Sequence, residues 1–142
     1  MTIQKDVNLI QYNTFQLDCI ARYFFELTHI SDLAKLSQFA RTEKLPIKFL
    51  GGGSNLILPG KLDALVIKNS LRGIQTAAES ESEYTVVCAS GEDWHLFVMS
   101  RLAQGQFGLE NLALIPGTVG GAPIQNIGAY GVEVNRFISK VT

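Results

Sequence analysis

The distribution of apolar residues predicts a strand, a helix and a second strand in the first third of the chain. The aromatic-rich run 21–28 predicts a strand. Ser31 is a suitable N-cap, and apolar residues at helical spacing predict a helix over 32–43, which Pro46 brings to an end. The run 47–50 predicts another strand. Together these elements form a βαβ unit, whose two strands should be parallel.

Beyond this unit, the pattern predicts short strands and one more helix. The expected strands are the runs 56–58, 64–68, 72–78 and 84–90, an acidic turn at 79–83 between the last two, and a final strand-like run at 134–141. Ser90 and Asp93 have the spacing of a capping box, with Ser90 at N-cap and Asp93 at N3. The helix that follows should end at Gly105. Its expected apolar side consists of Trp94, Phe97, Val98 and Leu102.

The composition is that of one globular domain. The chain has 142 residues, of which 46% are hydrophobic and 18% charged, enough to form a core. Its net charge of −1 and lack of a basic patch argue against nucleic-acid binding. No apolar run approaches the roughly 20 residues that cross a bilayer, and the start of the chain has no signal-peptide pattern. We therefore expect a cytoplasmic, soluble protein with no nucleic-acid or membrane partner.

The cysteines and histidines do not predict a metal centre. Cys19 and Cys88 are far apart in sequence and are expected to be buried thiols. His29 and His95 have no neighbouring cysteines or paired carboxylates, so both are expected to be structural or surface residues. Any redox chemistry must then come from a bound cofactor.

The first glycine-rich segment is the run Gly51, Gly52, Gly53, Ser54 and Asn55. Three consecutive glycines are entropically costly, and a simple hairpin needs only one or two residues with positive φ. One interpretation is a loop whose backbone N–H groups converge on phosphate oxygens. The other is a tight strand connection that tolerates glycines. The loop is neither a Walker A motif nor a Rossmann fingerprint.

The second glycine-rich segment covers residues 108–131, where Glu110 is the only charged residue. Such an apolar segment suits a path that winds closely around a flat apolar ligand. The residues after Pro116 are expected to open a short helical turn whose N–H groups face an anion. Amide groups for hydrogen bonds to a heterocycle come from Asn111, Gln125 and Asn126. The alternative is a buried irregular connection, whose polar backbone groups would need partners.

At these motifs the chain resembles the UDP-N-acetylenolpyruvoylglucosamine reductase family. The matching stretches are Asn13-Thr14-Phe15, GGGSNLIL at 51–58, GEDWH at 91–95 and the long run 108–134. The resemblance implies an α+β fold of the PCMH or vanillyl-alcohol-oxidase-like FAD-binding type. FAD would lie between two subdomains, at about 1–69 and 70–142. The second subdomain would be incomplete, and the substrate-binding C-terminal domain would be absent.

The resemblance also implies a set of site residues. Non-covalent FAD is expected, because Ser54-Asn55 stand where covalent relatives have a histidine. NADPH and a UDP-sugar would be the co-substrate and substrate in peptidoglycan synthesis, and Tyr130 matches a position near that substrate. The family's catalytic serine, arginine and glutamate would lie beyond Thr142, so no catalytic residue is assigned and the chain alone is expected to be inactive. A stand-alone FAD- or nucleotide-binding module is the alternative. The expected cofactor contacts are Gly51, Gly52, Gly53, Ser54, Asn55, Ile115, Pro116, Gly117, Thr118, Gly120, Gly121, Ala122, Ile124 and Gly128.

Overall fold

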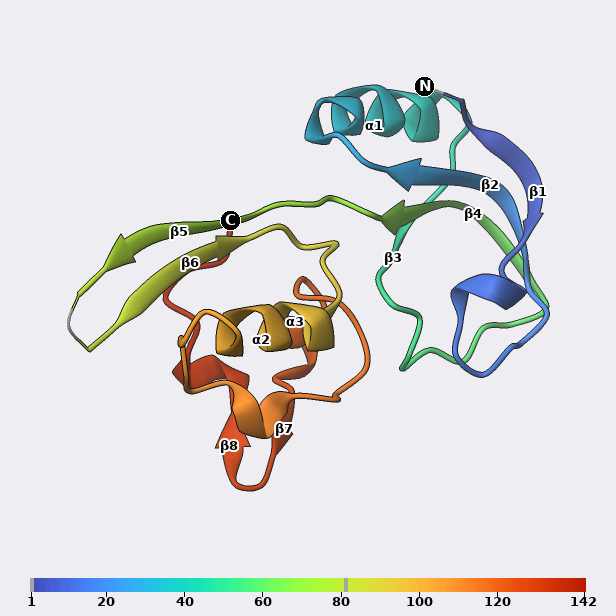
Figure 1. The fold of residues 1–142 in the computed structure, drawn as a ribbon. Helices are drawn as coiled ribbons and strands as arrows, with labels where there is room; N and C mark the ends of the chain where they lie inside the picture. The colour runs from blue at the N-terminus through green and yellow to red at the C-terminus, as the bar shows by residue number, and fades with distance from the viewer. Residues whose placement is uncertain (1, 81) are drawn as a thin grey trace. The chain divides into compact units, whose positions relative to one another are not determined.

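A computed structural model describes residues 2–80 and 82–142 of the chain. The chain divides into two compact units, one ending at Leu71 and the other running from Arg72 to Thr142 (Figure 1). Within the described residues, no helix is both long and apolar enough to span a membrane.

The first unit is built on a four-stranded sheet in the order β1-β2-β4-β3. Strand β1 is antiparallel to β2, while β2 and β3 are both parallel to β4, which lies between them. The expected βαβ unit with parallel strands is therefore confirmed, with β4 inserted at its centre. The strands are β1 (Gln4–Asn8), β2 (Ile20–Leu27), β3 (Ile47–Leu50) and β4 (Lys61–Asn69), and the helix is α1 (Leu33–Thr42).

Both faces of this sheet are covered, which explains why its central strands are almost continuously apolar. Tyr23 and Phe25 of β2 point to the face where Leu36 of α1 packs. Phe24, between them, belongs to a second cluster with Leu9 and Cys19 on the opposite face. The alternation of side chains along a strand thus divides one apolar run between two clusters.

Two local expectations for the first unit are wrong. Ser31 does not cap the helix: it lies within a 3₁₀ helix (Ile30–Asp32), and the N-cap of α1 is Asp32. The run 56–58 is not a strand, because it pairs with no neighbouring strand. Its central residue, Ile57, is 88% exposed. Apolar composition alone does not make a strand where no partner is available.

The second unit contains a hairpin, one substantial helix and a long irregular segment. Strands β5 (Ile74–Glu79) and β6 (Tyr84–Cys88) are antiparallel, as a turn at 79–83 requires, although residue 81 of that turn lies outside the described residues. Helix α2 is Trp94–Leu102, and its chain turns away at Gly105, which has φ +74°. The remaining elements are α3 (Ala122–Gln125), β7 (Gly128–Ala129), β8 (Val132–Glu133) and the 3₁₀ helices Glu110–Leu112 and Val134–Arg136.

The core of the second unit joins α2 to the irregular segment. Trp94, Phe97 and Val98 are buried on α2, as expected, whereas the expected Leu102 is half-buried and Arg101 is buried as well. The first three residues pack with buried residues from well-separated parts of the chain. The Trp94 indole N–H also donates to the Leu112 carbonyl oxygen at 2.7 Å. The partners of the α2 residues in this cluster are Leu112, Ala122 and Val134.

Three expectations for the second unit are corrected. The N-cap of α2 is Asp93, whose Oδ1 accepts from the Leu96 N–H at 2.9 Å, so Ser90 is not the cap. The run 134–141 is not a strand; it starts with a 3₁₀ helix, and the Val134 N–H donates back to the Ile127 carbonyl. The helical turn expected after Pro116 starts later than predicted: the Gly121 and Ala122 N–H groups donate to the Thr118 carbonyl oxygen, and α3 follows.

Candidate cofactor site

The first glycine-rich loop follows β3, at the end of a strand that is parallel to its neighbour. Its three glycines have different surroundings. Gly53 is buried with φ +68°, and a Cβ placed on it would lie 2.0 Å from the Tyr12 carbonyl oxygen. Gly52 is exposed. Gly53 is therefore required by the fold itself, while Gly52 leaves its backbone accessible to a ligand.

The backbone that Gly53 approaches belongs to a turn organised by Asn13. The buried Asn13 amide donates to the carbonyl oxygens of Leu9 and Leu17, and its Oδ1 accepts from the Leu17 N–H. The Thr14 N–H then donates to the Gly53 carbonyl oxygen at 3.1 Å. The Asn13-Thr14 motif thus holds the glycine loop in place from within the same unit.

Lys68 brings a positive charge to this loop, which sequence reasoning missed. Its Nζ donates to the Gly51 carbonyl oxygen at 2.7 Å from the neighbouring strand β4. A lysine in an apolar strand gave no motif to recognise. The register that places Lys68 opposite Leu50, the residue before the loop, emerges only from the sheet.

The second glycine-rich segment is fixed by an antiparallel exchange of backbone hydrogen bonds with residues 90–94. The Trp94 N–H donates to the Gly117 carbonyl, and Asp93 and Thr118 form an antiparallel bridge. The Val119 N–H then donates to the Glu92 carbonyl at 2.9 Å. Irregular backbone here is satisfied by other backbone, so the segment has a defined shape without a regular ladder.

The expected residues of this segment differ in exposure. Thr118 and Ala122 are buried, and Ala122 belongs to the core. Pro116 and Gly128 are exposed, and Ile124 is 85% exposed. Leu114, also in this segment, is 78% exposed with φ +65°, and its N–H donates to His95 Nδ1. The segment therefore presents an apolar surface on a fixed backbone. The remaining expected contacts are half-buried: Ile115, Gly117, Gly120 and Gly121.

Tyr130 lies at the tip of the two-residue turn that joins β7 to β8. It is 89% exposed and has φ +52°, and the following Gly131 has φ +78°. Positive φ at both central residues is the requirement of a type I′ turn. For a bulky residue this backbone conformation is strained, and such strain is concentrated at functional positions.

The cysteines and histidines form no metal-binding group in the part of the chain that the structure describes. Cys19 is buried, whereas Cys88 is only half-buried, and neither forms a disulfide. Burial first, and then the charge of Glu92, raises the pKa of Cys88 to about 11. A surface hollow of about 540 Å³ in the first unit, lined by Lys5, Asp6, Arg22, Tyr23, Lys61 and Asp63, contains none of the expected site residues.

Each unit by itself offers a surface that suits one part of a nucleotide cofactor. In the first unit, an accessible glycine beside a lysine suits an anionic group. In the second unit, an apolar surface on a fixed backbone suits a flat apolar ring. A family model described as FAD binding domain matches residues 21–142. The chain belongs to this family of FAD-binding domains.

Within that class, the chain is similar to UDP-N-acetylenolpyruvoylglucosamine reductases. It is 49% identical to the one from Chromobacterium violaceum and 44% identical to the one from Pseudomonas putida. These alignments cover 99% and 100% of this chain but 42% of each relative, so the chain spans about two fifths of their length. The solved reductase from Thermus caldophilus matches with a TM-score of 0.66 and 25% identity over 94% of this chain and 45% of that one. The expected α+β FAD-binding fold and the family resemblance are thus confirmed.

Proposed function

We propose that this chain is the N-terminal FAD-binding portion of a UDP-N-acetylenolpyruvoylglucosamine reductase and that it binds FAD non-covalently. The match of the FAD-binding family model over residues 21–142 supports FAD binding, and the 49% and 44% identity to reductases of that name supports the assignment to the reductase. The two compact units would be the two subdomains of that FAD-binding domain, the second of them incomplete, and the substrate-binding domain would be contributed by further sequence.

The loop Gly51–Asn55 is proposed to bind the pyrophosphate of FAD. Gly52 would let a phosphate oxygen approach the backbone, and the Ser54 hydroxyl and Asn55 amide are suitable hydrogen-bond donors. The Lys68 Nζ lies 2.7 Å from the Gly51 carbonyl oxygen, so its positive charge is next to the loop. A diphosphate bound at the loop would bring the opposite charge. Gly53 would contribute indirectly, by letting the loop pack against Tyr12.

The segment Ile115–Gly128 is proposed to pass along the flavin. Exposed Pro116, Ile124 and Gly128 would make the direct contacts, since an apolar ring system buries such surface favourably. The less exposed members would act through the backbone: Gly120 and Gly121 allow the tight path, and Ala122 anchors α3 in the core. When bound, FAD would supply the hydride-transfer chemistry that these residues cannot.

Titration of the chain with FAD, followed by flavin fluorescence, tests cofactor binding. We expect saturable binding that Gly52→Val weakens strongly, because a β-branched side chain would occupy the approach to the loop. Gly60→Val is the matched control: nothing lies within 4 Å of a Cβ at Gly60, and Gly60 is outside the proposed site. Equal affinity of both variants and the wild type would show that the loop is only a strand connection.

We further propose that the whole protein uses NADPH to reduce the enolpyruvyl group of the UDP-sugar, giving UDP-N-acetylmuramate for peptidoglycan synthesis in the cytoplasm. The support is the 42% to 49% identity to reductases of that name. Tyr130, strained and exposed at its turn, would contact the substrate. NADPH oxidation by the whole protein, with and without UDP-N-acetylenolpyruvoylglucosamine, is the assay. Absence of substrate-dependent turnover would refute this activity.

A further inference from the structure

The turn at residues 89–92 is attached to Gly73 at both of its ends. The Ala89 N–H donates to the Gly73 carbonyl oxygen at 2.8 Å, and the Gly73 N–H donates to Glu92 Oε1 at 2.7 Å. The turn itself is closed by the Glu92 N–H, which donates to the Ala89 carbonyl oxygen at 3.1 Å. Gly73 stands just before β5, so the turn is fixed to the start of the hairpin.

The carbonyl groups of this turn hold the second glycine-rich segment. The Ser90 carbonyl accepts from the Gly120 N–H at 2.8 Å, and the Glu92 carbonyl accepts from the Val119 N–H. Gly120 is so close to the turn that a Cβ on it would lie 2.6 Å from the Ser90 Cβ. A displacement of the turn is therefore transmitted directly to the backbone of residues 119–120.

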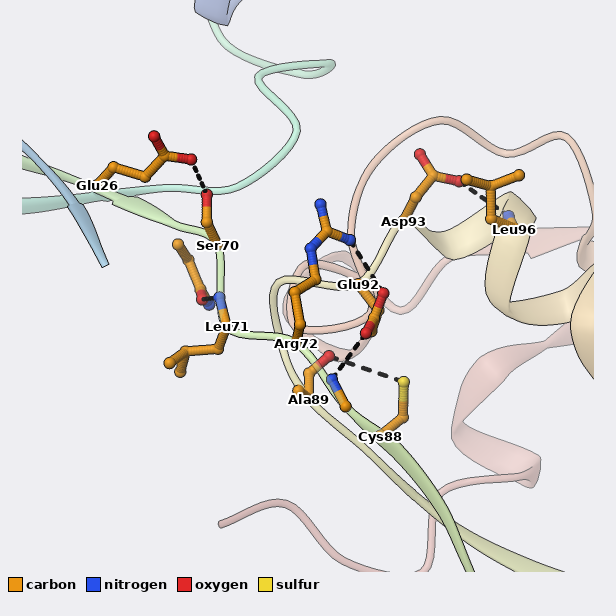
Figure 2. A network of polar contacts seen from close by, with 11 residues as sticks. Glu26, Ser70, Leu71, Arg72, Cys88, Ala89, Glu92, Asp93 and Leu96 are labelled. Atoms are coloured by element: carbon orange, nitrogen blue, oxygen red, sulfur yellow. Dashed lines mark hydrogen bonds and ion pairs between the residues drawn. The ribbon is translucent and has the colours of Figure 1, made fainter. Parts of the chain in front are cut away.

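The Glu92 side chain completes this arrangement. Figure 2 shows its carboxylate facing Arg72; Oε2 accepts from Arg72 Nη1 at 2.9 Å, while Oε1 accepts from Gly73. The Glu92 side chain is 19% exposed and that of Arg72 is 61% exposed. Both bonds involve exposed groups, but the Gly73 N–H is a fixed backbone donor, and it lowers the pKa of Glu92 more than Arg72 does. Since an exposed ion pair contributes little, we expect the Gly73 bond to be the stronger of the two.

We propose that Glu92 is a positioning residue for FAD binding: its carboxylate fixes the 89–92 turn on Gly73, and the turn sets the positions of Val119 and Gly120. This inference rests on the proposed function, since it assumes that the segment carrying Val119 and Gly120 contacts FAD. It assigns a role to Glu92, the first of the two acidic residues of the GEDWH motif, which is not among the expected cofactor contacts. Glu92 itself touches no cofactor in this role.

Affinity for FAD and amide hydrogen exchange are measured on the same 142-residue variants. Glu92→Ala removes both side-chain bonds and should weaken FAD binding about tenfold, and Glu92→Gln, which still accepts from Gly73, about threefold. Exchange of the Val119 and Gly120 amides should accelerate in both variants, with little change in the first unit. Arg72→Gln leaves the Gly73 bond intact and should have the smallest effect. Asp63→Asn removes the exposed Arg22–Asp63 ion pair in the other unit and serves as the control.

The pH dependence separates a positioning carboxylate from a merely space-filling side chain. The Gly73 N–H, and after it Arg72, hold the pKa of Glu92 below its ordinary value, although partial burial acts in the opposite direction. The advantage of wild type over Glu92→Gln in FAD affinity should therefore be present at neutral pH and disappear as acid protonates the carboxyl. Arg72 and Cys88 also face Glu92, and the Cys88 thiol, whose pKa is raised to about 11, stays neutral throughout that range. Asp93 caps α2 in both proteins.

The outcomes distinguish the two proposals. Equal FAD affinity and equal amide exchange of wild type and Glu92→Ala would overturn the positioning role, and so would a Glu92→Gln defect that persists in acid. If the wild type binds no FAD, the proposed function fails, and exchange at Val119 and Gly120 still decides whether Glu92 fixes the segment. If Glu92→Ala does not fold, the milder Glu92→Gln and Arg72→Gln variants decide the same question.

Discussion

The two units build their cores in contrasting ways. In the first unit, a four-stranded sheet has an apolar cluster on each face, and the glycine loop follows one strand of that sheet. In the second, a single helix packs against an irregular segment whose backbone is held by scattered individual hydrogen bonds. Local changes should therefore be resisted by the sheet in the first unit and transmitted along the irregular segment in the second.

Glycine substitutions give the largest expected contrast. Gly53→Ala should destabilise the protein by about 4 kcal/mol or more, because the added Cβ meets the backbone of Tyr12 and Asn13 at a left-handed φ. Gly120→Ala should cost less, because the approach of its Cβ to Ser90 is less severe, at 2.6 Å, and its φ is not in the left-handed region. Urea unfolding followed by circular dichroism measures both. Gly60→Ala, whose Cβ meets nothing within 4 Å, is the control. Equal losses of stability at Gly53 and Gly120 would contradict the difference expected between the two units.

Removal of one aromatic hydrogen-bond donor from each unit gives the next contrast. Trp94→Phe should lower the free energy of unfolding by about 1–3 kcal/mol, because the buried Leu112 carbonyl oxygen loses its hydrogen bond from the indole N–H. Tyr23→Phe should lower the free energy of unfolding by about 0.5 kcal/mol or less, because the Glu43 carboxylate that accepts from its hydroxyl can accept from water instead. The same unfolding experiment compares them. A Tyr23→Phe loss as large as that of Trp94→Phe would contradict the dependence of the second unit on single bonds.

The helix caps should differ by a smaller amount. Asp93→Ala should destabilise the protein by about 1 kcal/mol, since it removes the bond from the Leu96 N–H at the start of α2. Asp32→Ala at the N-cap of α1 should change stability by no more than about 0.5 kcal/mol, because Asp32 makes no side-chain capping bond. Thermal melting of both variants at neutral pH is sufficient. The interpretation of α2 fails if Asp32→Ala proves the more destabilising.

The cysteines provide a contrast without any loss of stability. The pKa of Cys88 is raised to about 11, so at pH 8 the thiol is protonated and alkylation should be about a hundredfold slower than for a thiol with a pKa near 9. Its rate should rise with pH until the thiolate forms. Cys19 is fully buried in the first unit and should react only when that unit opens. Mass spectrometry of alkylated peptides across a pH series tests both, and rapid labelling of Cys19 in folded protein would disprove its burial.

The sequence predicted best what depends on local pattern. The strands around Phe24 and Val66 and the helix containing Leu36 follow from apolar runs and spacing, and the structure has them. The capping residues were misassigned because Ser31 and Ser90 are good caps by type, whereas the cap is decided by where the chain turns into the helix. The expected strand at 134–141 failed because strands need partners, which no local pattern specifies.

The site was predictable in part for the same reason. Runs of glycine locate both segments, but they do not show that Gly53 is required for packing while Gly52 is accessible. That distinction depends on Tyr12, some forty positions away along the chain. Lys68 was not predicted because a single lysine in an apolar strand carries no motif, and its place follows from β-sheet register. Glu92 lies within the GEDWH match, but its role follows only from the turn that closes on Gly73.

The proposed contact of Tyr130 with the substrate would set stability against recognition at this turn. A type I′ turn is best made by Asn-Gly, yet here the first position is a tyrosine with φ +52°. A laboratory selection for thermal resistance alone would replace Tyr130 by asparagine or glycine, and the gain would come from relieving a strain of about 1–3 kcal/mol. A selection for ligand capture would retain the aromatic ring at its exposed tip. If the two selected populations carry different residues at position 130, the strained backbone of Tyr130 is retained for binding at the expense of stability.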